Sequence, residues 1–388
     1  RALLGGVVGL SRLEGGLIAP VAGWVIDKYG PRRMMFLGIG MMGFGFLALS
    51  QVNSLLMLYI VFIGLLAIGS SFGTNRPVEV TIANWFVRRR GRAMGLRTTG
   101  SGVGGAAVFL FALLIEGFGW RTGAIFAGLT LWGVGFPLTL VMRHKPEDMG
   151  LLPDGDRVSA ESGSDLVPSG EQSTSQEGRP PNPSAGSGSE EGRTSHHTLK
   201  PHRFWMRDPR YEIDLTVWQA LRTRAFWWMA LTYGIWASMP GITTVHIAPF
   251  LVEELGVDYL VALGALSFFV FASVFGRLSF GFLVDYLNIR LLMAALLVMQ
   301  GIGIFLFSEV HSMAQVPLYV IVFALPYGGF LPMRGVITGY FFGRQRFGTI
   351  GGLLSFVDLP ATVAAPIWVG WLADSIPGGY RIGFKIIA

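Results

Sequence analysis

The sequence contains no cysteine and is poor in charge, because only 14% of its 388 residues are Asp, Glu, Lys or Arg. The absence of cysteine excludes disulfide bonds, thiolate chemistry and cysteine-ligated metal sites. The scarcity of charge is accompanied by 52% hydrophobic residues and a mean hydropathy of +0.53. Such a composition is too apolar for a soluble domain of this length. It predicts an integral membrane protein whose main solvent is the lipid bilayer.

Acidic residues are fewer than basic ones, 24 against 30, which leaves a net charge of +6. In a soluble protein this balance would favour a nucleic-acid partner. Here the cations lie in short turns between apolar runs, as the positive-inside rule describes, so we expect no nucleic-acid partner. The sequence shows no catalytic triad, phosphate-binding loop or metal-ligand spacing. We therefore expect neither enzyme activity nor a cofactor or metal.

Ten apolar runs approach or exceed the 20 or so residues that a helix needs to span a bilayer. They cover residues 3–26, 32–50, 55–86, 92–115, 121–142, 225–252, 258–284, 290–308, 314–342 and 348–373. Glycine is abundant inside these runs, where small residues let helix backbones approach closely. The pattern predicts an all-α bundle of about ten complete transmembrane helices.

The middle of the chain has a different composition, rich in Ser, Gly, Pro and Glu and without helical periodicity. This composition predicts a disordered linker at 143–215 between two transmembrane halves at 1–142 and 216–388. At the end of the linker, Thr216 and Gln219 have the spacing of a capping box, which predicts a short interfacial helix.

A turn after the first run recurs in the second half of the chain. Residues 23–33 read GWVIDKYGPRR, and residues 281–290 repeat the order of Gly, three apolar residues, Asp and a later cation at an offset of 258. The turns at 90–96 and 119–123 recur at 346–352 and 379–383, at nearly the same spacing. A parallel repeat of this kind predicts two pseudo-equivalent halves.

The turns on one side of the predicted bundle carry most of the cations. These are Lys28, Arg32, Arg33, Arg88, Arg89, Arg90, Arg92, Arg290, Arg344 and Arg346. The positive-inside rule places that side and the linker in the cytoplasm. We expect a multi-pass protein of the cell membrane, the inner membrane in bacteria.

These turns resemble the major facilitator superfamily, in which the turn between helices 2 and 3 reads Gly-x-x-x-Asp-x-x-Gly-x-Arg-Arg and recurs, degraded, between helices 8 and 9. The resemblance implies two six-helix halves and secondary active transport by alternating access, in a protein that we expect to be a monomer. It makes the first run helix 2, so we expect the chain to lack helix 1 and most of helix 12. In this fold the signature turns would form a conformational latch. Its candidate residues are Asp27, Arg32, Arg33, Arg92 and Asp285.

Six charged residues lie inside the apolar runs at a shared depth. Counted from the cation-rich turns at about 1.5 Å per residue, they fall roughly 12–17 Å deep. They are Glu14, Arg76, Glu79, Arg277, Arg334 and Asp358. Charges in lipid are costly, so a common level favours a substrate site between the halves. The alternative is a set of internal ion pairs, above all between Arg76 and Glu79, which are three residues apart.

Two of these arginines, Arg277 and Arg334, have no acidic residue within one turn in the sequence. A buried guanidinium needs an anion, and it can bind a carboxylate through two parallel hydrogen bonds, that is, bidentately. That anion is either Asp358, Glu14 or Glu79, or the carboxylate of a substrate. We also consider His246 as a proton relay or gate, against the simpler interpretation of a structural hydrogen bond.

Four segments narrow the resemblance to the bacterial monocarboxylate-porter and oxalate/formate-antiporter branch; they are residues 84–91, 145–155, 244–250 and 276–281. In that branch an arginine of helix 8 holds the substrate carboxylate, and Arg277 occupies this position. Animal monocarboxylate transporters have an Asp where this chain has Ser273, and the oxalate exchanger has a Lys where it has Asp358. Proton coupling through helix 8 and exchange of a dianion are therefore not expected.

The sequence thus predicts a transporter of a small, monocarboxylate-like organic anion, with proton coupling left open. The candidate substrate-binding residues are Arg277, Arg334, Arg76 and His246, and the candidate proton-coupling residues are Glu79, Asp358 and Glu14. Two alternatives remain open. One is an efflux pump for an amphipathic drug or metabolite, and the other is a transport-dead receptor or assembly subunit.

Overall fold

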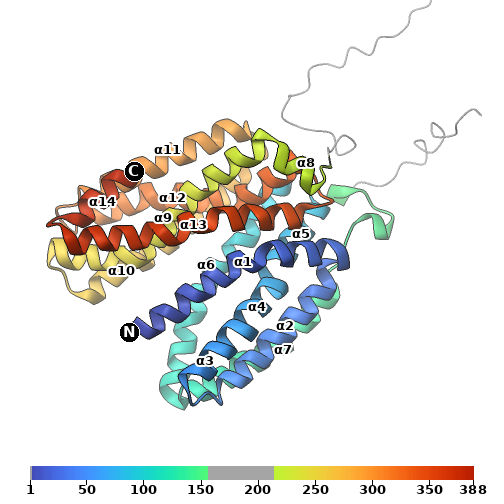
Figure 1. The fold of residues 1–388 in the computed structure, drawn as a ribbon, viewed down its shortest axis with the longest axis horizontal. Helices are drawn as coiled ribbons and strands as arrows, with labels where there is room; N and C mark the ends of the chain where they lie inside the picture. The colour runs from blue at the N-terminus through green and yellow to red at the C-terminus, as the bar shows by residue number, and fades with distance from the viewer. Residues whose placement is uncertain (1, 156–213) are drawn as a thin grey trace, which may run out of the picture.

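The computed structural model describes residues 2–155 and 214–388, and in these ranges almost all of the chain is helical (Figure 1). Ten long helical segments match the ten predicted spans within a few residues at each end, so the all-α membrane fold is confirmed. Among the described residues, seven helices are long and apolar enough to cross a membrane by length and composition alone.

The first half of the chain forms one bundle. Its elements are α1 (Ala2–Tyr29), α2 (Pro31–Leu49), α3 (Leu55–Val61), η1 (Phe62–Ala67), α4 (Ile68–Ser70), η2 (Ser71–Asn75), α5 (Arg76–Trp85), α6 (Arg90–Phe118) and α7 (Trp120–Val141). The segments from α3 to α5 follow one another without a break and make a single long span.

The second half forms the other bundle. Its elements are α8 (Val217–Arg222), α9 (Arg224–Leu255), α10 (Tyr259–Leu283), α11 (Ile289–Ser308), α12 (Val316–Phe342), α13 (Phe347–Ser375) and α14 (Gly379–Ile387). The predicted capping box is present at the start of α8, where Thr216 and Gln219 bond reciprocally. Two of its long helices, α12 and α13, each carry two internal prolines.

The two bundles meet at one end and spread apart toward the other (Figure 1). The contact is made by α1 along α13 and by α6 along α10. Glycine permits this close approach, because a Cβ at Gly23 would lie 2.0 Å from the carbonyl oxygen of Gly348. We call the end where the bundles meet the closed side, and the opposite end the open side.

Two aspartates from the repeated turns fasten the closed side. Asp27 at the end of α1 accepts hydrogen bonds from the backbone nitrogens of Gly348 (3.0 Å) and Thr349 (2.7 Å) in the first turn of α13. Asp285 after α10 does the same for Gly91 (2.8 Å) and Arg92 (3.2 Å) in the first turn of α6. A carboxylate at a helix N-terminus satisfies unpaired N–H groups and the helix dipole. The two contacts are reciprocal, and both join the halves.

The surroundings of Asp285 shift the pKa of its carboxyl in opposite directions. Burial raises the pKa of the Asp285 carboxyl, while the backbone donors of Gly91 and Arg92 and the nearby guanidinium lower it, and burial is the largest of these effects. Arg92 lies 3.5 Å from the carboxylate and stacks over the ring of Phe282. In the first signature turn, Arg32 is half-buried and Arg33 is exposed, both at the start of α2.

The first part of the expected linker differs from the prediction of disorder. Residues 143–155 include two short 3-10 turns, η3 (Glu147–Met149) and η4 (Pro153–Gly155), of which η4 contacts α5. Asp154 accepts hydrogen bonds from the backbone nitrogens at positions 87, 88 and 89. Glu147 reaches across to Arg344 of the second half, 3.1 Å away. The polar composition of this segment favoured a disordered linker. Composition does not reveal that Asp154 binds backbone N–H groups and that Glu147 pairs with Arg344.

Candidate functional site

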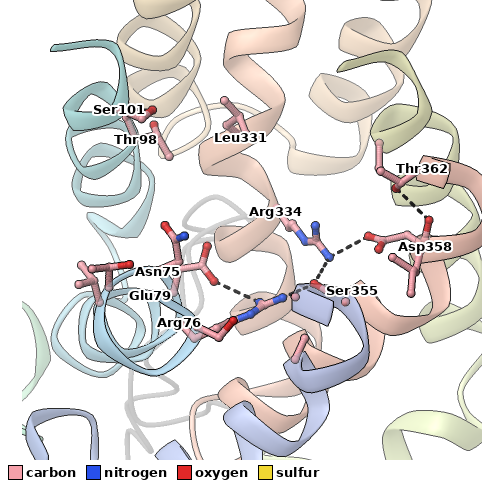
Figure 2. A pocket seen from close by; sticks show the side chains of 18 of the residues that line it. Asn75, Arg76, Glu79, Thr98, Ser101, Leu331, Arg334, Ser355, Asp358 and Thr362 are labelled. Carbon is pink, nitrogen blue, oxygen red and sulfur yellow. Dashed lines mark hydrogen bonds and ion pairs between the residues drawn. The ribbon is translucent and has the colours of Figure 1, made fainter. Parts of the chain in front are cut away.

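A cavity of about 770 Å³ lies between the two bundles (Figure 2). Residues of α1, η2, α5 and α6 line it from the first half, and residues of α9, α12 and α13 from the second. It contains four of the six midplane charges that the sequence predicted, and one that it did not, Arg97. They are Arg76, Glu79, Arg97, Arg334 and Asp358.

A widened stretch of helix delivers Arg76 to the cavity. The π-helical turn η2 ends directly before Arg76, and Pro77 follows it. Proline has no N–H to donate and its ring disturbs the preceding turn, so the chain there departs from the regular α-helical pattern. The regular α-helix is therefore interrupted directly before Arg76 and Pro77, in the form of a π-helical turn.

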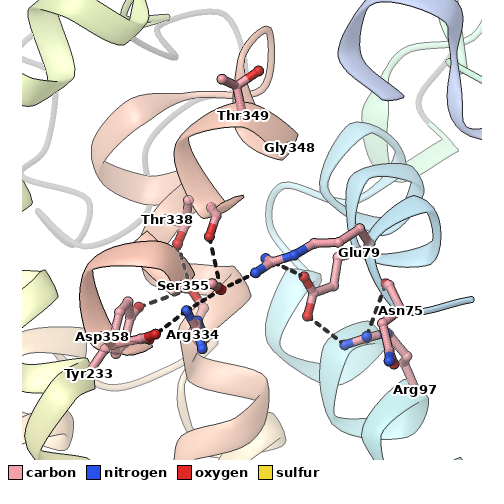
Figure 3. Close-up of polar contacts among 12 residues, drawn as sticks. Asn75, Glu79, Arg97, Tyr233, Arg334, Thr338, Gly348, Thr349, Ser355 and Asp358 are labelled. Atoms are coloured by element: carbon pink, nitrogen blue, oxygen red, sulfur yellow. Dashed lines mark hydrogen bonds and ion pairs between the residues drawn. The ribbon is translucent and has the colours of Figure 1, made fainter. Parts of the chain in front are cut away.

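Glu79 is held by two arginines (Figure 3). Arg76 lies 3.2 Å from it, one turn away on α5, and Arg97 of α6 lies 2.9 Å from its other oxygen. Arg97 also donates to the carbonyl oxygen of Asn75. The sequence analysis did not single out Arg97, although it stands about 10 Å beyond Arg90 along α6. Its depth in the bilayer, counted from Arg90, could have identified it as a further buried charge.

The second half contributes one ion pair. Arg334 of α12 donates to Asp358 of α13 at 2.8 Å and to the hydroxyl of Ser355 at 2.7 Å. The face of Tyr233 lies under its guanidinium, 5.0 Å away. Arg76 from the first half also donates to Ser355, so the two arginines converge on one hydroxyl (Figure 2). Sequence reasoning did not identify Ser355, because a serine in an apolar run carries no signal.

The charges of the cavity do not cancel. Three arginines face two carboxylates, which leaves one net positive charge among the described lining residues when all five are ionised. In a medium of low dielectric an unmatched charge is costly, and an anion offsets that cost. The cavity therefore has the electrostatic character of a site for a singly charged anion.

Arg277 lies behind the cavity wall instead of inside the cavity. Its side chain is 5% exposed, and it donates to the carbonyl oxygen of Thr98 (2.6 Å) and the hydroxyl of Ser101 on α6. It also donates to Ser273, one turn before it on α10. Thr98 and Ser101 line the cavity, whereas Arg277 does not. Among the described residues Arg277 has no ion pair. Asp358, one of the anions considered for it, is bound to Arg334 instead.

The two remaining candidates are not part of this cluster. His246 of α9 is bonded through Nε2 to the carbonyl oxygen of Pro366 at 2.8 Å, and it packs near Tyr380. It does not line the cavity. Glu14 is on α1, but its side chain lies outside the part of the structure that is described.

A family model decides the classification, since the model of the Major Facilitator Superfamily matches residues 2–366. The chain belongs to this superfamily. Curated relatives include proteins named as a monocarboxylate transporter and an MFS transporter, and this chain is a multi-pass membrane protein. The fold and the superfamily that the sequence predicts are thus confirmed.

Curated relatives of two kinds align with part of the chain. The "Fujikurins efflux protein" of Gibberella fujikuroi is 33% identical over 138 residues, which cover 33% of this chain and 28% of that protein. "Monocarboxylate transporter 13" of Bos taurus is 32% identical over 151 residues, which cover 33% of this chain and 35% of that protein. The alignments thus span about a third of these relatives.

A solved structure is similar over nearly the whole chain. It is the human organic anion transporter MFSD10, with a TM-score of 0.67 at 13% identity, covering 99% of this chain and 80% of that one. At this identity the likeness concerns the fold alone.

Proposed function

We propose that this protein is a secondary transporter that moves a small, monocarboxylate-like organic anion across the membrane by alternating access. The observation that carries the proposal is the net positive cavity between the halves, in which three arginines face two carboxylates. The similarity to a monocarboxylate transporter supports the same substrate class. The closed side carries the cation-rich turns, which favours a cytoplasmic location for the closed side. The cavity would then open to the outside, so the structure corresponds to an outward-facing state.

The experiment is uptake of radiolabelled carboxylates of two to five carbons into proteoliposomes containing the protein, with and without a pH gradient. At least one carboxylate should accumulate above protein-free vesicles. Arg334→Gln should abolish that uptake, whereas Arg290→Gln, which removes a cation at the start of α11 outside the cavity, should leave it intact. The proposal is wrong if no carboxylate is taken up, or if both variants behave alike.

A second candidate is efflux of a larger amphipathic anion. It is favoured by the volume of the cavity, which is in the range that holds drug-sized ligands, and by its apolar lining at Trp236, Tyr327 and Leu331. The similarity to an efflux protein supports it as well. Competition separates the two candidates, because only the second predicts that an aromatic carboxylate of about ten carbons displaces a small one and is itself transported.

A further inference from the structure

Two arginines from opposite halves share one neutral acceptor. The hydroxyl of Ser355 receives a hydrogen bond from Arg76 of the first bundle and another, at 2.7 Å, from Arg334 of the second. It gives its own proton to the carbonyl oxygen of Gly351. A hydroxyl has one donor and two acceptor positions, so Ser355 is saturated. Its neutral oxygen does nothing to offset the repulsion between the two guanidiniums.

The two arginines are equivalent members of the internal repeat. Their numbers differ by 258, the offset that separates Asp27 from Asp285, and Phe72 and Phe330 precede them at the same spacing. Each also binds a carboxylate of its own half, Glu79 for Arg76 and Asp358 for Arg334. The repeat therefore presents one arginine from each half to a single point in the cavity.

We propose that Ser355 marks the position of the substrate carboxylate, which binds with one oxygen toward Arg76 and the other toward Arg334. This inference rests on the proposed function and names its binding point. A carboxylate at this position accepts the hydrogen bonds of the two arginines in place of the Ser355 hydroxyl. The hydroxyl of Ser355 then donates to the carboxylate instead of to Gly351. Charge-assisted bonds to two guanidiniums are stronger than those to a neutral oxygen. The substrate class is a monoanion, because one negative charge balances the described residues of the cavity.

The binding point has a mechanical consequence. Because α5 belongs to one bundle and α12 to the other, an anion between their arginines attracts both halves. Occupancy of the site thereby favours closure of the open side. Arg277 cannot play this part in the arrangement seen here, because it is behind the wall and bonded to α6.

A tethered carboxylate tests the proposal. Ser355→Asp places an anion between the two arginines without any ligand, so the purified protein should unfold at a temperature higher by on the order of 3–6 °C. Its apparent affinity for acetate, lactate and benzoate should fall at least tenfold, because the point is already filled. Ser355→Asn is the neutral control of equal size, and it should not raise the unfolding temperature.

A second control separates position from charge. Ser71→Asp adds the same carboxylate to the cavity wall more than one turn before Arg76, where it neutralises net charge without bridging the halves. Ser355→Asp should be more stable than Ser71→Asp. Equal unfolding temperatures for these two variants, or undiminished binding of the three anions by Ser355→Asp, would overturn the proposal.

The outcomes also distinguish this inference from the proposed function. If wild-type vesicles take up no carboxylate while Ser355→Asp is selectively stabilised, the transport proposal fails and the anion point stands. If wild type transports carboxylates and Ser355→Asp still does so without gaining stability, transport stands and the binding point is wrong.

Discussion

Arg277 has one role in the family resemblance and different contacts in the structure. The resemblance assigns it the substrate carboxylate, whereas its contacts in this arrangement join α10 to α6 through Thr98 and Ser101. Its Nε has no hydrogen-bond partner among the described residues. A buried guanidinium with only neutral acceptors remains available to an anion that reaches it.

The first prediction concerns this arginine. Arg277→Lys keeps the charge but loses the planar fork, so carboxylate binding should weaken by roughly 1.5–3 kcal/mol if Arg277 holds substrate in any state of the cycle. Equilibrium binding of the transported carboxylate measures the effect. Ser101→Ala is the control, because it removes a contact between the halves and spares the charge. An equal loss of binding in both variants would mean that Arg277 acts only between the halves.

The second prediction separates the two carboxylates of the cavity. Asp358 has one arginine, Arg334, whereas Glu79 has two, Arg76 and Arg97. A substrate that draws Arg334 away leaves Asp358 without a cation, and a buried carboxylate in that condition takes up a proton more readily. Glu79 keeps Arg97. If transport is proton-coupled, Asp358→Asn should therefore abolish uptake driven by a pH gradient while exchange of substrate continues, and Glu79→Gln should retain coupling.

The control for that measurement is Asp374→Asn, the same chemical change on the same helix at an exposed position. Uptake that still responds to the pH gradient in both Asp358→Asn and Glu79→Gln would remove these two residues as the coupling groups.

At the scale of helices, the reciprocal caps on α6 and α13 connect the two halves. Removing the negative charge of a capping carboxylate costs about 0.3–1 kcal/mol through the helix dipole. Asp27→Asn should accordingly slow transport several-fold while substrate affinity stays within a few-fold, because Asp27 is away from the cavity charges. Asp285→Asn should behave alike. Turnover and equilibrium binding in the same preparation provide the check.

Asp258→Asn is a matched control for the caps. Asp258 caps α10, but its hydrogen bond to Leu260 stays within one half. This variant should leave turnover per folded molecule unchanged. If Asp27→Asn lost binding while turnover per bound substrate remained normal, a latch would be the wrong description of Asp27.

The next prediction concerns the contribution of the 143–155 segment to stability. Asp154 has a side chain that is 1% exposed and a backbone φ of 64°, which only Gly, Asn and Asp adopt readily. Asp154→Ala should destabilise the protein by about 1–3 kcal/mol, because three backbone N–H groups lose their shared acceptor. Glu147→Gln should cost no more than about 1 kcal/mol, since its pair with Arg344 is partly exposed. Thermal unfolding measures both.

Shortening the chain inside 156–200 to a flexible span that still joins the bundles should, by contrast, leave uptake unchanged. The polar composition of that stretch cannot bury apolar surface, so only its reach matters. A shortened protein that inserts normally and fails to transport would show that this stretch binds something.

At the scale of the whole molecule, the proposed alternating access requires the closed side to separate. The chain has no cysteine, so a pair of introduced thiols can be cross-linked selectively. Lys145→Cys with Gln345→Cys places one thiol on each side of a small cavity of about 290 Å³ at the closed side. A short reversible cross-linker should stop uptake in this double variant, and a reductant should restore it.

The corresponding control is Asn53→Cys with His311→Cys, which lie on turns at the open side, one in each bundle. This pair should resist the same short reagent in the arrangement described here. Continued transport by the cross-linked Lys145 and Gln345 pair would contradict alternating access through opening of the closed side.

Much of the architecture was predictable from the sequence, because it depends on properties that are local along the chain. Helix length follows from the thickness of the hydrocarbon layer, so the ten spans could be placed within a few residues. The break before Pro77 and the capping box at Thr216 follow from backbone chemistry alone. Depth in the bilayer follows from the helical rise, which is how four of the cavity charges were found.

Only the tertiary structure decided which groups meet. Counting residues gives a depth but not the face of the helix or the neighbour it meets, so Arg277 and Arg334 looked alike in the sequence. Arg277 lies behind the cavity wall and donates to the carbonyl oxygen of Thr98, whereas Arg334 lines the cavity and donates to Asp358. The contact between Arg76 and Ser355 joins residues 279 positions apart. Such a contact depends on how two bundles pack against each other, which no local property of either segment contains.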